Sequence, residues 1–83
     1  MTDIDPGLIR TWQASRLKAE QVAARLAAEL RGRQRWEAVD GSLHIAVRMG
    51  VSEATVRRAK SLLAGHGAIM KDAAHRAPGY YVT

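Results

Sequence analysis

The chain has 83 residues, 47% of them hydrophobic, and a formal net charge of +5. This length suits one small domain. The absence of cysteine excludes a disulfide framework and a Cys-based metal site. Because the sequence has no long apolar run and no signal-peptide pattern, we expect a cytoplasmic protein. The basic excess favours a polyanionic partner, most often nucleic acid, over the alternative of a soluble protein with a basic surface.

The N-terminal part of the chain is predicted to be helical. Asp5 is a candidate N-cap, and Pro6 suits the first turn that follows it. Between residues 8 and 32, apolar residues recur at alternating spacings of four and three, which places them on one helix face. The pattern leaves open one long helix or two helices broken near residues 15–18, and Gly32 marks its C-terminal end. The stripe consists of Leu8, Trp12, Ser15, Ala19, Val22, Leu26 and Leu30.

A second, shorter helix is predicted after a connector at residues 34–39. The connector contains Trp36, which we expect to be a core or hinge residue rather than a stacking platform. Asp40 or Ser42 is expected to cap a helix over residues 43–49. The buried side of this helix is predicted to consist of Ile45, Ala46 and Met49.

The stretch from Gly50 onwards carries the most informative pattern. A turn at Gly50 leads to Ser52, a good N-cap, and a helix is predicted from Glu53 towards Ala64. This is the pattern of a helix-turn-helix whose second helix offers an arginine-bearing face to a DNA groove. The apolar side of the helix carries Val56, Ala59, Leu62 and Leu63, and the polar side carries Arg57, Arg58 and Ser61.

The C-terminal part predicts a β-hairpin. Residues 68–71 alternate like a strand and pair with residues 79–82 across a loop at residues 72–78. Tyr80 and Tyr81 alternate faces, so one of them is expected to pack on the helices. Three helices followed by a hairpin form a winged helix. The predicted fold is therefore mainly α with a small β-hairpin, preceded by a helical extension.

Four segments occur in a recognisable order along the chain. They are V-D-G-S-L-H-I-A from Val39, G-V-S-E-A-T-V-R-R-A-K-S-L-L from Gly50, then Gly67, and G-Y-Y-V from Gly79. The region from Val22 to Val82 thereby resembles the DNA-binding domain of the GntR family of bacterial transcription regulators. The family pattern at these places is L-P-S-E-R-E-L-A, G-V-S-R-x-T-V-R-x-A-L-x-x-L, a glycine, and a wing ending in G-Y/F-x-V.

The resemblance implies a winged helix that binds operator DNA as a two-fold pair, with the third helix in the major groove and the wing near the minor groove. On this basis, residues 1–17 form an N-terminal tail and helical extension, and residues 18–83 form the winged-helix DNA-binding domain. We expect it to act without the effector-binding domain that most family members carry. The chain departs from the family at Leu43 and Glu53, where members commonly have arginines that reach guanine.

The expected DNA contacts lie in the third helix and the wing. Arg57 and Arg58 are the main candidates, because arginine forms bidentate bonds with phosphate or guanine. The alternative is a solvated face on which Glu53 pairs with Arg57. Glu53 is expected to stabilise the helix dipole or to accept a hydrogen bond from cytosine, and Lys60 is placed where the helix leaves the groove. The candidate residues are Ser52, Glu53, Ala54, Thr55, Arg57, Arg58, Lys71, His75 and Arg76, of which the last two are equally consistent with a flexible polar loop.

No catalytic or metal-binding arrangement is apparent in the sequence. The histidines His44, His66 and His75 lack metal-ligand spacing, the acidic residues are scattered, and no phosphate-binding loop follows a strand. We therefore expect no enzyme, cofactor, metal or small-molecule effector. Two functions remain: a DNA-binding transcriptional regulator of a bacterium, plasmid or phage, or a winged helix that binds protein or serves as an architectural component of a nucleoprotein complex.

The apolar residues of the N-terminal extension also require an explanation. Leu8, Ile9 and Trp12 are too apolar to be left in solvent without a role. They predict self-association on DNA as a dimer. The alternative, weighted equally, is that they fold back and enlarge the core of the monomer.

Overall fold

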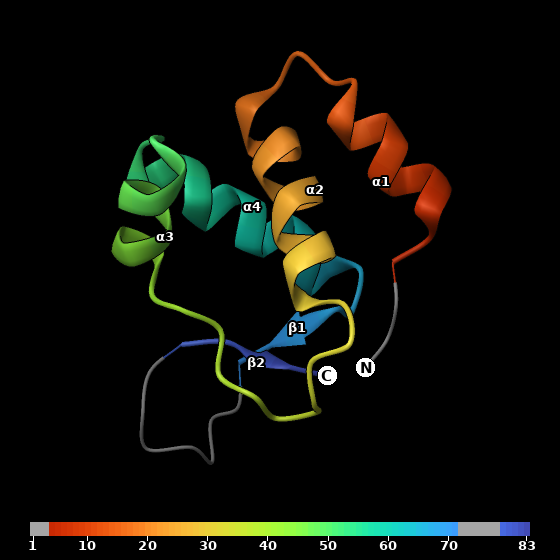
Figure 1. Ribbon diagram of the computed structural model, residues 1–83, viewed down its shortest axis with the longest axis vertical. Helices are drawn as coiled ribbons and strands as arrows, with labels where there is room; N and C mark the ends of the chain where they lie inside the picture. Colours follow the sequence, from red (N-terminus) through yellow and green to blue (C-terminus); the bar gives the residue numbers. More distant parts are fainter. Residues whose placement is uncertain (1–3, 72–78) are drawn as a thin grey trace.

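The computed structural model describes residues 4–71 and 79–83, which form four helices and a two-stranded antiparallel sheet (Figure 1). The mainly helical fold with a small β-hairpin is as the sequence predicts. His75 and Arg76 of the predicted wing lie outside the described residues. The elements in chain order are α1 (Pro6–Gln13), α2 (Lys18–Leu30), α3 (Ser42–Met49), α4 (Glu53–Gly65), β1 (Ile69–Met70) and β2 (Tyr81–Val82).

The predicted N-terminal stripe is divided between two helices, so the two-helix alternative is correct. The break is stabilised by Ser15, whose hydroxyl accepts a hydrogen bond from the Leu17 N–H at 3.0 Å and donates one to Glu20 Oε2 at 3.0 Å. The Ser15 carbonyl accepts a bond from the side-chain amide of Gln21 at 2.6 Å. Such local bonds compete with helical ones and end α1. At the other end of α1, Asp5 occupies the N-cap position, but its side chain makes no capping bond.

Of the N-caps predicted for α3 and α4, only the one for α4 is confirmed. Ser52 caps α4 as predicted, because its hydroxyl accepts a hydrogen bond from the Thr55 N–H at 3.1 Å. The caps predicted for α3 are wrong, since Gly41 occupies the N-cap position and no side chain caps it. Ser42 is already the first helical residue, and Asp40 lies one residue too early. The backbone of Gly41 is extended there, with φ −61° and ψ 150°.

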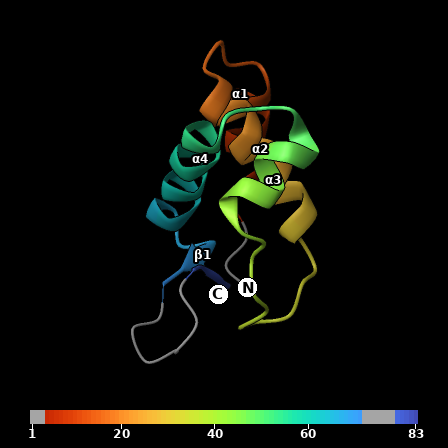
Figure 2. The same cartoon turned by 90° about the vertical axis from the view of Figure 1, so that its left-hand side faces the viewer.

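The core is built around α4, which packs against both α2 and α3 (Figure 2). Val56, Ala59 and Leu63 of α4 are fully buried, as their spacing predicts. Lys60 is buried as well, and its Nζ donates a hydrogen bond to the Asp40 carbonyl at 2.7 Å. A lysine can bury its aliphatic stem in apolar surroundings while its ammonium reaches a polar atom, so burial leaves the position of Lys60 relative to a DNA groove a prediction.

The N-terminal extension packs on the monomer's own core. Trp12 is only 4% exposed, and its ring meets that of His66 edge to face, with 5.4 Å between the ring centroids. Ile4 is buried too, and Leu8 and Ile9 pack half-buried against the core. Of the two explanations for these residues, folding back onto the core is thus correct. Self-association on DNA stays a prediction, and it would need another surface.

The small sheet has a third participant that the sequence does not predict. On one edge, β2 pairs with β1, and both strands are shorter than expected. On the other edge β2 bonds to the connector: the Trp36 N–H donates to the Val82 carbonyl at 2.7 Å, and the Val82 N–H donates to the Glu37 carbonyl at 2.9 Å. Tyr81 is buried in this sheet and Tyr80 is half-buried, as their alternation predicts. The pairs in register are Ile69 with Val82 and Met70 with Tyr81.

Trp36 does not enter the core, which corrects one of its two predicted roles. Its side chain is 42% exposed, and the guanidinium of Arg35 lies 5.6 Å from the centre of its ring. Its backbone has φ +69°, an uncommon conformation for a residue other than glycine. Trp36 thus lies at a bend of the connector, and its role as a hinge stays a prediction.

Candidate nucleic-acid interface

The N-terminal half of α4 presents a polar face whose local structure is well defined. Ser52 caps the helix through the Thr55 N–H, and the two hydroxyl oxygens lie 2.8 Å apart. The apolar positions of the helix turn towards α2 and α3, so the remaining positions must face solvent. The exposed side chains on this face are Ala54, Arg57, Arg58 and Ser61.

Glu53 and Arg57 form the ion pair that their spacing predicts. Arg57 Nη2 donates to Glu53 Oε1 at 2.7 Å, and the two side chains are 67% and 37% exposed, respectively. An exposed pair of this kind stabilises the helix by only a few tenths of a kcal/mol. The pair therefore holds the Arg57 side chain in place without removing it from solvent.

Two open hollows flank the exposed face of α4. The first, which we call the α2 hollow, has a volume of about 630 Å³ and lies between α4 and the start of α2. Lys18 and Glu20 line it from α2, and Arg58 lines it from α4. Arg57 and Ser61 border this hollow and also the second one, so they form the ridge between the two.

The second hollow, which we call the hairpin hollow, has a volume of about 590 Å³. It lies between α4, the start of α3 and the base of the β-hairpin. Lys60 and Glu53 line it from α4, and Lys71 and Tyr80 line it from the hairpin. The Nζ atoms of Lys60 and Lys71 lie 5.9 and 5.2 Å from the centre of the Tyr80 ring.

The pKa of Lys60 is shifted by its surroundings in the hairpin hollow. Burial of its ammonium lowers the pKa of Lys60, and the nearby charge of Lys71 lowers it further, while the carboxylate of Asp40 opposes both effects. Lys60 is thus a cation held in a poorly hydrated place beside a second cation. An anion in this hollow would stabilise the charged form of both lysines.

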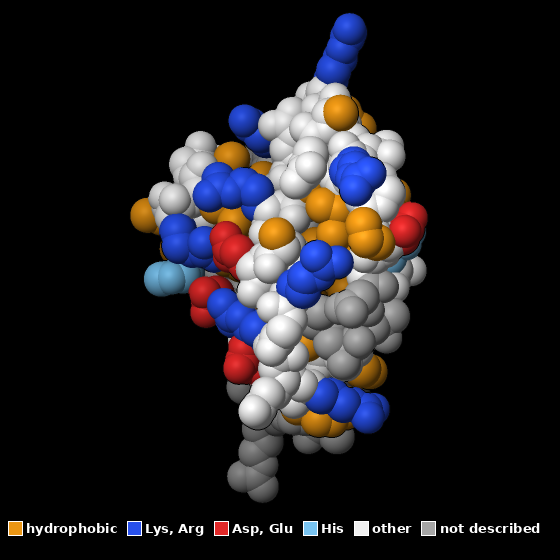
Figure 3. Space-filling view, turned by 45° about the vertical axis from the view of Figure 1, so that its right-hand side comes forward, with side chains coloured by type: hydrophobic (Ala, Val, Ile, Leu, Met, Phe, Trp, Pro, Cys, Tyr) orange, Lys and Arg blue, Asp and Glu red, His pale blue; other side chains and the backbone are white. Residues whose placement is uncertain are grey.

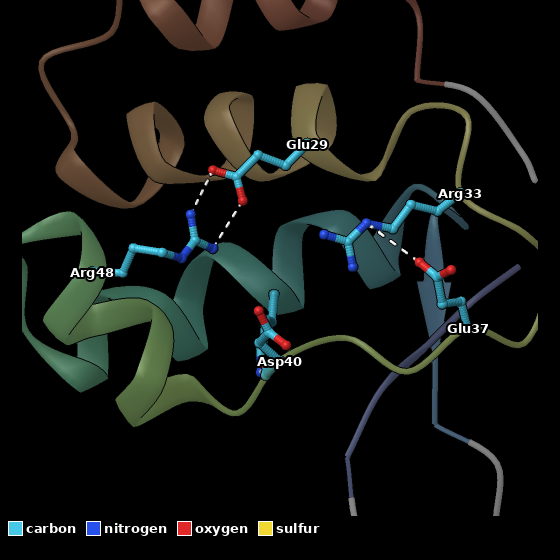
Figure 4. Close-up of polar contacts among 6 residues, drawn as sticks. Glu29, Arg33, Glu37, Asp40 and Arg48 are labelled. Carbon is cyan, nitrogen blue, oxygen red and sulfur yellow. Dashed lines mark hydrogen bonds and ion pairs between the residues drawn. The ribbon is translucent and has the colours of Figure 1, made fainter.

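A bidentate ion pair links α3 to α2. Arg48 of α3 donates to both carboxylate oxygens of Glu29 of α2, at 2.9 and 2.8 Å (Figure 4). This hydrogen-bonded partner holds the pKa of the Glu29 carboxyl below its usual range. Arg33 and Glu37 form a further pair at 3.3 Å within the connector region. The Glu29–Arg48 pair thus joins α2 to the helix that precedes α4.

The structure brings most of the predicted site residues together. Ser52, Glu53, Ala54, Thr55, Arg57 and Arg58 all lie on the first turns of α4, and Lys71 lies across the hairpin hollow from them. Sequence analysis missed Lys18, which faces Arg58 across the α2 hollow. No local signal could identify Lys18, since that placement depends on the packing of α2 on α4. It also missed Tyr80 as a neighbour of two lysines.

Basic side chains are spread over the face of the molecule that Figure 3 shows. In the view of Figure 3, lysine and arginine side chains outnumber acidic ones and are separated by small apolar patches. Among the described residues there is no group of three or more His, Cys, Asp or Glu side chains that could hold a metal ion. Within the same residues, no helix combines the length and apolar character needed to cross a membrane.

Comparisons with known proteins add no further evidence: no family model matches the chain, and neither the curated proteins nor the solved structures contain a match. The resemblance to the GntR family therefore stays a prediction. The functional argument rests on the geometry of α4 and the two hollows beside it.

Proposed function

We propose that this protein binds duplex DNA through α4 and the two hollows that flank it, and that it acts as a transcriptional regulator. The observation that carries the proposal is the exposed face of α4, with Arg57 on its ridge and cationic side chains on both flanks. In this proposal the fold is a winged helix, α4 lies in the major groove, and the loop between β1 and β2 lies near the minor groove.

The dimensions of a helix and of DNA support this docking. A helix with its side chains is about 10–12 Å across, and the major groove of B-DNA is about 12 Å wide. A helix in the groove therefore has a phosphate backbone along each flank. Lys18 and Arg58 would meet one backbone at the α2 hollow, and Lys71 would meet the other at the hairpin hollow.

The order of elements supports the winged-helix assignment. A helix is followed by a connector that pairs with β2, then by the two helices of a helix-turn-helix, and then by the hairpin. Gly50, in the left-handed conformation with φ +69°, makes the sharp turn between α3 and α4. That φ suits glycine because it has no Cβ.

The proposal is tested with the double variant Arg57→Ala/Arg58→Ala. Each charged hydrogen bond contributes roughly 1.5–3 kcal/mol, so the variant should bind duplex DNA at least several-fold more weakly in fluorescence anisotropy. Arg10→Ala removes an exposed charge from α1 and should bind as the parent does. A double variant that is folded by circular dichroism and binds as tightly as the parent would refute the assignment.

One observation favours a second function, protein binding. Leu43 and Val47 lie one turn apart on α3 and are 62% and 77% exposed. An apolar pair of this kind suits a protein contact better than a DNA backbone. If the chain binds duplex DNA no better than the double variant does, a protein-interaction or architectural role becomes the better account.

A further inference from the structure

The hairpin hollow gathers positive charge around one aromatic ring. The ammonium groups of Lys60 and Lys71 both lie within 6 Å of the centre of the Tyr80 ring, although the two residues come from different elements. Among the described residues, the hydrogen-bond acceptor of Lys60 Nζ is the Asp40 carbonyl, at 2.7 Å. An ammonium has three N–H donors, so this bond leaves capacity for another acceptor.

Within the part of the chain that the structure describes, the carboxylates near this hollow are fewer than its cations. Glu53 lines the hollow, but its carboxylate is engaged by Arg57 at 2.7 Å. Asp40 interacts with Lys60 through its charge and is itself exposed. Counted over residues 4–71 and 79–83, the three cations Arg57, Lys60 and Lys71 thus face the two carboxylates of Glu53 and Asp40, an excess of one positive charge.

We infer that the hairpin hollow holds one backbone phosphate of the bound DNA, contacted by Lys71 and Lys60 beside the Tyr80 ring. This inference rests on the proposed function and adds to it a defined phosphate site. Its source is the DNA strand rather than a free anion, because the hollow is open and borders the ridge formed by Arg57 and Ser61. Phosphate contacts of this kind fix the orientation of a protein on the duplex without reading its sequence.

Lys60 is 4% exposed, yet it contributes to the lining of the hairpin hollow. Its Nζ is held by the Asp40 carbonyl at the edge of the hollow, so its position is set before any ligand arrives. Lys71 is exposed and has freedom to close on a phosphate. Beside the Tyr80 ring, Lys60 would thus provide a fixed contact with the phosphate and Lys71 an adjustable one.

The test is the salt dependence of duplex binding by Lys71→Gln, measured by fluorescence anisotropy. Loss of one phosphate contact reduces the slope of log K against log salt by about 0.9, and we expect this reduction for Lys71→Gln. Lys71→Arg should keep the slope of the parent. Arg10→Gln removes the same charge from a position outside both hollows and should also keep it.

Arg58→Gln separates this inference from the proposed function, because Arg58 lines the α2 hollow and does not line the hairpin hollow. If Arg58→Gln lowers the slope and Lys71→Gln does not, the phosphate site is wrong while DNA binding stands. If neither the two variants nor the parent bind duplex DNA, the phosphate site and the proposed function are both wrong. A titration of the parent with inorganic phosphate should produce no saturable NMR chemical-shift change at Lys71 and Tyr80. A saturable change, together with an unchanged slope of log K against log salt for Lys71→Gln, would show that the hollow binds a free anion and would overturn the assignment.

Discussion

Replacing Glu53 by arginine reverses the charge at the start of α4, the helix that is proposed to enter the major groove. A carboxylate accepts hydrogen bonds and repels phosphate, so Glu53 can accept a bond from a cytosine amino group but cannot contact guanine as arginine does. In the structure it also holds Arg57 through a 2.7 Å ion pair. Glu53→Arg should therefore raise the affinity for duplex DNA in general and move the preferred sequence towards guanine.

The cost in stability follows from the two interactions that the substitution removes. The pair with Arg57 contributes about 0.3–0.5 kcal/mol, and reversing the charge at the helix N-terminus costs about 0.3–1 kcal/mol. A total of roughly 1 kcal/mol lowers the Tm of a domain of this size by about 4–8 °C. Glu53→Gln is the matched control, because it removes the ion pair without adding a positive charge.

Selection from random duplexes, run on the parent and on Glu53→Arg, measures the effect on DNA recognition, and thermal unfolding by circular dichroism measures the effect on stability. The added arginine should increase the slope of log K against log salt by about 0.9 if it reaches a phosphate. Identical preferred sites and equal affinities would mean that residue 53 does not face the DNA, and the docking of α4 would have to be abandoned.

Two further predictions concern the fold that carries the site. Trp12→Ala should destabilise the monomer by roughly 3–5 kcal/mol in urea unfolding, because the side chain is buried against His66. The control Arg10→Ala should change the free energy of unfolding by less than about 0.5 kcal/mol. A Trp12→Ala monomer as stable as the parent would contradict the core packing of α1. The pKa of Glu29 is lowered in the folded state, so its contribution to stability is present above the unfolded value of 4.5 and is lost as the pH falls through the lower folded value. The unfolding free energies of the parent and of Glu29→Gln should therefore differ at pH 6 and converge as the pH falls below the lowered folded pKa, whereas a constant difference would show that the bond to Arg48 does not contribute.

The local features of this chain could be predicted from its sequence. The Ser52 cap and the buried and exposed sides of α4 depend on residues within one or two turns of each other, and they appear where expected. Gly32 and Gly50 have positive φ at the ends of their helices, which is also a local property of glycine.

The features that were missed depend on contacts between distant parts of the chain. Lys60 is polar by type, and only the packing of α4 beside the Asp40 carbonyl explains its burial. The pairing of the connector with β2 joins residues more than forty positions apart, and no periodicity in the sequence predicts it. The sequence leaves open whether Trp12 packs against a partner or in the core. Its apolar character predicts that the side chain is buried, but it does not predict which surface buries it.

The most direct test of DNA binding by α4 is NMR chemical-shift mapping with a duplex of about two helical turns. We expect the largest amide shifts at residues 52–61, with further shifts at Lys18 and Lys71 and little change in α1. Shifts confined to the exposed Leu43 and Val47 surface of α3, or no shifts at low salt, would contradict the account.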